Sequence, residues 1–430
     1  MFPTDYKFDV VLGYVCEEQV VAGIQGQMAV SEKQYFISFK ASHQMSNLLL
    51  KDVNSFVFHK FNKYFRIKSC SFNNQPLTTN FTKSVITHLR LHTHEDDDFI
   101  EWVLGVDKFS ILKKIDGENT EAPIQFYLMN FGTDLVHELP FSDSSQAILD
   151  NKRDDRNLIY RGGKVKIGFD SDSNTPYLRF STHKDSIHQE FLCLLSFYYQ
   201  LPIKNWIVVK HKKDCLEYNY SSPFVAYKGD SKRQKEWDCY STKDEKHLRL
   251  DDFVDSVNTF IEQSPVFQKD IVFKALYNFV DIQMDSDQSQ FIFLVNILST
   301  LSEKMHKYKG DTTRIIKKLF KLHNVSFPQI DDELQKQNFQ RTEVKKQKCW
   351  FFKFCLRRKL MKSDQRINTF VDLRNELTHG LPTKEMLDYL HNSLILPRLK
   401  MGVFFILLSE LGMKDLKYRY LTDALKVQKS

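Results

Sequence analysis

Residues 372–380 read Asp372-Leu373-Arg374-Asn375-Glu376-Leu377-Thr378-His379-Gly380. Around this stretch, positions three, four and seven apart form one stripe, which consists of Ile367, Phe370, Val371, Leu377 and Thr378. Arg374 lies at the centre of this stripe, where an amphipathic helix normally places an apolar side chain. The spacing predicts an α-helix over 367–379 that carries a guanidinium on its inner face.

A guanidinium keeps its charge at any relevant pH, and burying an unpaired charge costs several kcal/mol or more. Arg374 must therefore meet a carboxylate, carbonyl oxygens or a bound anion such as phosphate. Two interpretations stay open on the residues alone. Arg374 either pairs with a neighbouring Glu or Asp in a purely structural role, or it binds an anion.

His379 is followed by Gly380 and Pro382, the usual order at a helix end, so the imidazole is expected in the last turn. The negative end of the helix dipole favours its protonated form there. Five residues rotate by about 140° along a regular helix, so Arg374 and His379 would not face one point. A shared site requires a distorted last turn or a second copy of the helix.

The pattern Arg374-Asn375-x-x-x-His379 resembles the R-x4-6-H motif of HEPN domains, a helical superfamily with many metal-independent ribonucleases. Arg-Asn-x-Leu-Thr-His-Gly is most similar to the ApeA-like HEPN group of bacterial anti-phage, or abortive-infection, proteins. The segment Phe291–Glu303 also resembles the helix that precedes the motif in that group. The resemblance covers about the last 180 residues of the chain. It implies a β-rich domain followed by a helical one.

The resemblance implies a catalytic role for Arg374, Asn375 and His379. RNA would be cleaved by attack of its own 2′-hydroxyl, without metal or other cofactor, leaving 2′,3′-cyclic phosphate and 5′-hydroxyl ends. HEPN proteins commonly pair, so a homodimer is expected. By analogy, the N-terminal domain would regulate the nuclease and sense a phage-derived trigger. The competing interpretation is a protein that binds RNA or another protein without cleaving it.

Between Arg341 and Arg366 there are ten basic residues against two acidic ones. This local charge of +8 exceeds the +7 of the whole chain, and four aromatic residues are interleaved with it. Such a mixture suits phosphate contacts and base stacking, so RNA is the expected partner. The positions expected to contact it are Lys353, Arg357, Arg358 and Lys362. The alternative is a helix with an aromatic core face and a solvated basic face.

The first part of the chain shows mostly strand-like alternation, punctuated by turn signals. The expected strands are Lys7–Leu12, Gln34–Lys40, Val57–Ile67, Ile86–His92, Ile124–Asn130, Lys164–Phe169, Tyr177–Thr182 and Trp206–His211. One helix is expected among them, over Ser186–Gln200. Residues 1–240 are therefore predicted to form a β-rich domain, a sandwich or barrel-like fold.

Residues 241–430 change to helical periodicity and are predicted to form an all-α bundle. The expected helices are Phe253–Ile261, Ile271–Met284, Phe291–Tyr308, Thr313–Leu322, Trp350–Met361, Ile367–His379, Met386–Leu396, Val403–Leu411 and Leu416–Val427. The fold class is thus α+β. The boundary is placed near residue 240, after a polar, charged crossing.

Composition excludes several classes of function. No apolar stretch approaches the roughly 20 residues that span a bilayer, and no secretion signal is recognisable, so the protein is expected in the cytoplasm without membrane contact. The seven scattered cysteines lack a C-x-x-C pair and are expected to be reduced. No nucleotide-binding loop, serine-esterase or zincin motif is present.

Three imidazoles, those of His88, His92 and His94, would share one face of a strand and could bind a metal. A polar outer strand face explains the same residues, so no metal site is predicted. Residues 303–306 and the three carboxylates of Asp281, Asp285 and Asp287 are expected to be exposed helix or turn positions.

Overall fold

The computed structural model describes the greater part of the chain. The described residues are 6–16, 19–30, 35–51, 60–81, 83–93, 98–114, 124–129, 156–170, 175–182, 184–199, 203–212, 215–221, 239–241, 249–282, 285–329, 339–340, 364–365, 369–379, 384–413 and 416–418. The chain divides into two compact units. Unit 1 consists of Met1–Leu192 and Ile203–Arg233, and unit 2 of Cys193–Pro202 and Gln234–Ser430.

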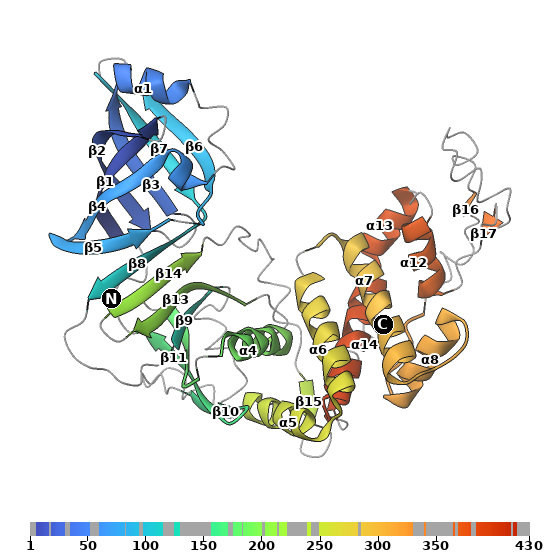
Figure 1. Cartoon of the computed structure of the whole chain (residues 1–430). Coiled ribbons are helices and arrows are strands. Elements are labelled where there is room, and N and C mark those ends of the chain that lie inside the picture. Colours follow the sequence, from blue (N-terminus) through green and yellow to red (C-terminus); the bar gives the residue numbers. More distant parts are fainter. Residues whose placement is uncertain are drawn as a thin grey trace, which may run out of the picture. The chain divides into compact units, whose positions relative to one another are not determined.

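Unit 1 is built on antiparallel strands, drawn in blue to green in Figure 1. They are β1 (Tyr6–Cys16), β2 (Gln19–Val30), β3 (Tyr35–Ser42), β4 (Phe65–Phe72), β5 (Gln75–Asn80), β6 (Ile86–Thr93), β7 (Phe99–Val106), β8 (Lys108–Lys114), β9 (Ile124–Met129), β10 (Arg156–Tyr160), β11 (Gly163–Asp170), β12 (Thr175–Phe180), β13 (Lys204–Lys212) and β14 (Cys215–Ser221). Their hydrogen-bonded order is β10-β11-β12-β9-β13-β14-β8-β5-β4-β1-β2-β3-β7-β6. Every described pairing is antiparallel.

Period-two alternation explains why these segments form strands. In β3, buried and more exposed side chains alternate from Tyr35 to Ser42. The inward-facing residues join one hydrophobic cluster, which contains buried side chains from β1–β4, β6–β9 and β12–β14, and Trp102 and Tyr35 are among its largest fully buried members. Two tight hairpins use residues of positive φ at both central positions, Asn73-Asn74 and Arg161-Gly162. This is the conformation that a two-residue turn requires to match the twist of the strands.

Most of the expected strands are confirmed, with one correction. The segment Val57–Ile67 is not one strand: Phe61–Lys63 forms a short 3-10 helix, η1, and β4 starts only at Phe65. Six strands were not expected, namely β2, β5, β7, β8, β10 and β14. In β7, residues from Val103 to Val106 form an almost unbroken apolar run, which obscures the alternation that marks a half-buried strand. The described part of this region also has an unexpected helix, α1 (His43–Leu50).

The embedded helix expected over 186–200 is confirmed as α4 (Asp185–Tyr198). The division between the two units falls within it, at Leu192. Phe197, in its last turns, is fully buried and packs against Phe253, Phe279 and Phe404, all of which belong to unit 2. This end of α4 therefore contributes to the aromatic core of unit 2.

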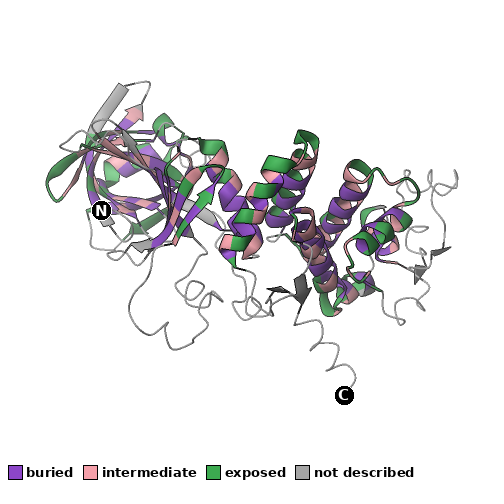
Figure 2. Cartoon of the chain, turned by 90° about the horizontal axis from the view of Figure 1, so that it is seen from below, coloured by how far each residue is buried: buried purple, intermediate pink, exposed green. Residues whose placement is uncertain are grey.

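Unit 2 is mainly helical. Its described helices are α5 (Leu250–Gln263), α6 (Val266–Asp281), α7 (Asp287–Thr300), the π-helical turn η4 (Leu301–Met305), α8 (Thr312–Leu322), α12 (Phe370–His379), α13 (Lys384–Asn392) and α14 (Ile395–Glu410). α7 contacts α6, α8, α12, α13 and α14, so it lies at the centre of the packing. Figure 2 shows the buried positions on the inner faces of these helices.

The expectation of an all-α second region needs correction at its C-terminal end. Leu416–Tyr418 was expected to begin a helix, but it forms β18, which pairs with β15 (Cys239–Ser241). A second small pair joins β16 (Phe339–Gln340) to β17 (Asp364–Gln365). α14 starts at Ile395, eight residues earlier than expected. Pro397 is compatible with this start, since it sits in the first turn, where no intrahelical N–H is needed. The expected helix over 350–361 lies outside the described residues.

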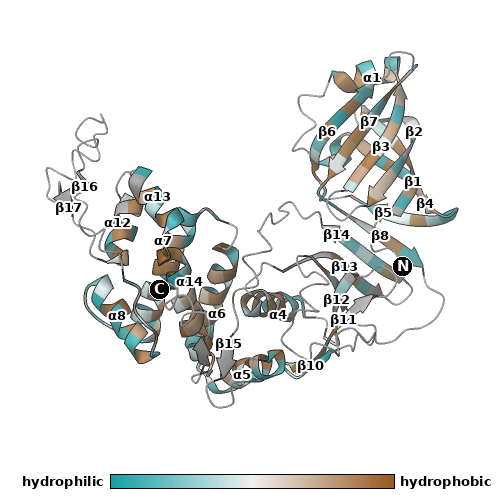
Figure 3. Ribbon diagram, turned by 180° about the vertical axis from the view of Figure 1, so that it is seen from behind, coloured by the Kyte–Doolittle hydropathy of each residue, from teal (hydrophilic) through white to brown (hydrophobic). Residues whose placement is uncertain are grey.

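No single helix of the described chain is long and apolar enough to cross a membrane. α13 and α14 reach that length and hydrophobicity only when they are taken together, across a bend of 61°. Figure 3 shows how hydrophobic α14 is, and most of its residues, such as Leu399 and Phe404, are buried inside the protein. The described structure thus has a large antiparallel β region followed by a helical one.

Candidate functional site on α12

The N-terminus of α12 is fixed by reciprocal hydrogen bonds between Thr369 and Asp372. The Asp372 amide donates to the Thr369 hydroxyl oxygen at 3.2 Å, and the Thr369 amide donates to the Asp372 carboxylate at 2.9 Å. This capping box satisfies amide groups that otherwise lack partners at a helix start. α12 therefore starts at Phe370, three residues later than the apolar stripe predicted; Ile367 lies outside the described residues.

The inner face of α12 is close to the predicted stripe. Phe370, Val371 and Leu377 are buried, as expected, but Thr378 is exposed. Leu373, which was not part of the predicted stripe, is fully buried. The Thr378 hydroxyl donates to the Arg374 carbonyl one turn earlier, which lets a polar side chain sit on the outer face of the helix.

Arg374 is half-buried between α12 and α7, and both of its described partners are amide oxygens. Its NH1 group donates to Oδ1 of the neighbouring Asn375 at 2.9 Å, and NH2 donates to Oδ1 of Asn296 in α7. The Nε atom is buried and has no hydrogen-bond partner among the described residues. Asn296 and Asn375 thus hold the guanidinium in one orientation from two helices.

These partners orient the Arg374 charge without neutralising it. An amide oxygen carries only a partial charge, whereas a carboxylate would cancel the cation. No described carboxylate makes an ion pair with Arg374, so the structural alternative of pairing with Glu or Asp has no support in the described part of unit 2. A half-buried guanidinium with neutral partners, and with N–H groups that no described residue accepts, is suited to bind an anion.

The motif histidine is the last residue of α12, as expected from the Gly-x-Pro stop that follows it. Its backbone is helical and its side chain is outside the described atoms. α12 is assigned as regular α-helix from Phe370 to His379, so no distorted last turn brings the two motif residues to one side. The rotation of about 140° between Arg374 and His379 therefore applies.

α7 is the element against which α12 is placed. Besides the Asn296 contact, the Gln288 side-chain amide donates to the Leu377 carbonyl at 3.3 Å, next to the end of α12. At the start of α7, Asp287 meets His391 of α13 at 2.8 Å between Oδ2 and Nδ1. α7 thus carries polar contacts to both helices that flank the motif, and Asp287 is not merely an exposed helix position.

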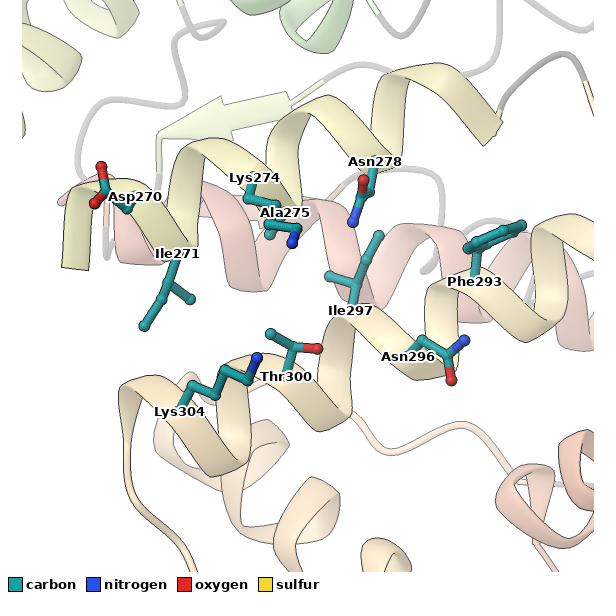
Figure 4. A pocket seen from close by; sticks show the side chains of 10 residues that line it. All are labelled: Asp270, Ile271, Lys274, Ala275, Asn278, Phe293, Asn296, Ile297, Thr300 and Lys304. Carbon is teal, nitrogen blue, oxygen red and sulfur yellow. The ribbon is translucent and has the colours of Figure 1, made fainter. Parts of the chain in front are cut away.

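A groove of about 210 Å³ runs between α6 and α7 with its continuation η4, next to the helix face that holds Arg374. Figure 4 shows its side chains, which are Asp270, Ile271, Lys274, Ala275, Asn278, Phe293, Asn296, Ile297, Thr300 and Lys304. Lys274, Lys304 and Phe293 are exposed. Asn296 belongs both to this groove and to the Arg374 contact.

The basic run that was expected to contact RNA lies almost wholly outside the described residues. This applies to Lys353, Arg357, Arg358 and Lys362; only Asp364 and Gln365 of the run are described, as β17. In the histidine cluster of unit 1, His94 is also outside them. His88 packs edge-on against Phe36, burial lowers the pKa of its imidazole, and His92 is exposed on β6.

Sequence reasoning missed two features of unit 2. Asn296 lies 78 residues before Arg374, and no periodicity distinguishes it from other polar helix positions. His306, expected to be an exposed position, is in fact only 20% exposed at its side chain and contacts Glu410, which itself contacts His323. Long-range packing alone creates both sets of contacts.

No protein-family model, curated protein or solved structure matches this chain.

Proposed function

We propose that the protein is a metal-independent endoribonuclease of the HEPN type that acts in bacterial defence against phage. The observation that supports this most directly is the Arg374 guanidinium, which two helices hold between the amide oxygens of Asn296 and Asn375, without an ion-paired carboxylate among the described residues. A fixed, unneutralised cation is what stabilisation of a pentacoordinate phosphate requires. The resemblance of 374–379 to the HEPN motif supplies the reaction.

The proposed chemistry assigns one task to each motif residue. The 2′-hydroxyl of the substrate attacks the adjacent phosphate, and the bond from phosphorus to the 5′-oxygen breaks. Arg374 stabilises the charge that builds on the phosphate oxygens, and Asn375 keeps the guanidinium oriented. His379 moves the proton, either from the 2′-hydroxyl or to the leaving 5′-oxygen. DNA, which lacks the 2′-hydroxyl, is not a substrate.

The groove between α6 and α7 is proposed as part of the RNA path. Lys274 and Lys304 provide two exposed positive charges, against the single carboxylate of Asp270 at one end. Phe293 provides an exposed aromatic ring on which a base can stack. Asn296 connects this groove to Arg374, so an RNA strand lying in it would pass the helix that holds the guanidinium. The basic run 341–366 is proposed to add further phosphate contacts.

A homodimer is proposed because one regular helix cannot aim both motif residues at one phosphate. With about 140° between Arg374 and His379, a second α12 can present His379 to the phosphate held by Arg374 of the first. The β-rich unit 1 is proposed as the regulator that responds to a phage-derived trigger, by analogy with ApeA-like proteins.

The test is incubation of purified protein with total cellular RNA in EDTA, with the termini of the products analysed. Wild-type protein is expected to cut RNA and to leave 2′,3′-cyclic phosphate and 5′-hydroxyl ends. His379→Ala and Arg374→Ala should lose cleavage by about 10²-fold or more, the size expected for removal of an acid–base group or a charge-stabilising donor. Thr378→Ala, an exposed change on the same helix, should retain it.

Circular dichroism in the same EDTA buffer must show that each variant remains folded. If wild-type protein leaves RNA intact in vitro, the measurement is repeated in phage-infected cells, where the trigger is present. Intact RNA there as well, or full activity of both motif variants, contradicts the nuclease proposal. RNA binding without cleavage would identify the alternative, a non-catalytic binding protein.

A further inference from the structure

Three helices of unit 2 end at one cluster of side chains, formed by His306, His323 and Glu410. His306 follows the last residue of η4, His323 follows the last residue of α8, and Glu410 is the last residue of α14. Oε1 of Glu410 lies 2.5 Å from Nε2 of His306 and 2.8 Å from Nε2 of His323. One carboxylate oxygen and two imidazole nitrogens, separated by up to 104 residues in the chain, thus converge on one point.

We propose that this cluster binds a divalent first-row transition metal ion, with zinc as the first ion to test. Two imidazoles and one carboxylate form a donor set that suits such ions. The three ligand atoms all lie within 4.8 Å of one another. Metal bonds of 2.0–2.1 Å in a tetrahedral site place ligand atoms about 3.3 Å apart, so the two carboxylate–imidazole distances would have to lengthen by about 0.5–0.8 Å.

The second observation is a buried nitrogen without a partner. The His323 side chain is only 7% exposed, and its Nε2 atom has no hydrogen bond among the described residues, although the carboxylate oxygen is close. The contact is short, but the ring nitrogen is not aligned with the oxygen as a hydrogen bond requires. A metal ion on the lone-pair axis of this nitrogen would satisfy it, with the carboxylate oxygen beside that axis.

The second ring nitrogen of His323, Nδ1, already has the kind of hydrogen-bond contact that a metal-binding histidine needs. Nδ1 of His323 lies 2.8 Å from the hydroxyl oxygen of Ser409, the residue before Glu410. A hydrogen bond at the second ring nitrogen fixes the tautomer and orientation of a ligating histidine.

The backbone around the cluster favours a positive charge as well. Carbonyl groups without intrahelical partners and the negative end of the dipole lie at a helix C-terminus, and three C-termini meet here. One of them is a π-helical turn, a rare geometry that is frequent at functional sites. His306, at 20% exposure, is the most open of the three ligands and leaves room for a water molecule as the fourth.

The test is calorimetric titration of chelator-treated full-length protein with zinc chloride. Wild-type protein is expected to bind one zinc ion, and its Tm should rise with zinc concentration. His306→Gln, His323→Gln and Glu410→Gln should each weaken binding by about 100-fold or more. Ser409→Ala, which removes only the contact to His323, should weaken it by about 10-fold. His391→Gln is the matched control, because the described contact of His391 is with the carboxylate of Asp287, and the change should leave zinc binding unchanged.

Cobalt(II) provides a readout that does not depend on the variants being folded. Wild-type protein should give the visible spectrum of a tetrahedral site without a thiolate charge-transfer band, since the proposed ligands contain no sulfur. The absence of stoichiometric zinc binding overturns the proposal, as does a thiolate band or equal zinc affinity in wild type and folded ligand variants. RNA cleavage in EDTA is measured separately, so either proposal can fail without the other.

Discussion

At the scale of single residues, Asn296 has the most informative position in unit 2. Its amide oxygen accepts a hydrogen bond from Arg374, where a carboxylate of the same shape would form a salt bridge. The choice of Asn keeps Arg374 in place and leaves its charge available to a phosphate. Under the proposed nuclease function, Asn296 is a positioning residue, which would act on the substrate through Arg374.

Asn296→Asp is expected to separate stability from activity. The new carboxylate should pair with Arg374, so the Tm should be unchanged or higher, while RNA cleavage falls by about 10²-fold because the phosphate must compete with an internal anion. Asn278→Asp is the control, because it adds the same charge to the groove without touching Arg374. Equal cleavage by wild type and Asn296→Asp would remove the positioning role.

The buried ammonium group of Lys400 should make the free energy of unfolding depend on pH. Burial in α14 lowers the pKa of its ammonium from the ordinary 10.5 to about 8. The charged form is therefore less stable in the folded than in the unfolded chain. This cost is fully present below pH 8, and it disappears as the pH rises from about 8 toward 10.5, where the folded protein has already released the proton.

Lys400→Met should accordingly stabilise the protein at pH 7 by about 1–3 kcal/mol, and the gain should shrink toward pH 10.5. Chemical denaturation at pH 7, 8.5 and 10 measures this difference. Lys384→Met, at an exposed position of α13, serves as the control and should show a small effect that does not depend on pH. A constant gain for Lys400→Met over this range would show that its burial does not perturb its charge.

At the scale of single elements, the capping box decides where α12 begins. Thr369→Ala removes the hydroxyl that accepts from the Asp372 amide and should destabilise the protein by about 1 kcal/mol. Thr378→Ala removes a hydroxyl from the exposed side of the same helix and should change stability by less than about half of that. Denaturation midpoints of the two variants test this ranking, and equal losses would contradict it.

A helix or strand could be predicted where its signal lies within its own sequence, and not where it depends on a distant partner. α4, α5, α7 and α8 follow from helical periodicity, because each has an apolar face that repeats within its own sequence. β18 does not, because its partner β15 lies about 175 residues earlier and two three-residue strands have no period to detect. For α14, the start was expected at Val403 and lies at Ile395, with Pro397 in the first helical turn, where proline is tolerated.

The candidate site shows the same limit. The motif at 374–379 and the end of its helix were readable from local sequence, since a capping His and Gly are local signals. Asn296 and the cluster of His306, His323 and Glu410 were not, because each depends on which helices pack together. The motif residues could thus be identified from the sequence, whereas the side chains from other helices that contact one another could not.

At the scale of the whole molecule, the angle between Arg374 and His379 bears on whether the proposed nuclease needs one chain or two. α12 is regular throughout, so the two side chains start about 140° apart around its axis. If the active phosphate takes Arg374 from one copy and His379 from the other, each copy supplies one residue to a shared site. The oligomeric state is then a condition for catalysis.

Mixed dimers test this arrangement directly. Arg374→Ala protein mixed with His379→Ala protein should regain cleavage, because the first copy supplies His379 and the second supplies Arg374 to one complete site. Wild-type protein paired with the double variant Arg374→Ala/His379→Ala should be inactive, because its intact residues lie on the same copy. Differently tagged copies are purified as mixed dimers and assayed on RNA. This distinguishes a site shared by two copies from a site within one copy. The reverse pattern would place both residues in one chain and require α12 to rearrange when RNA binds.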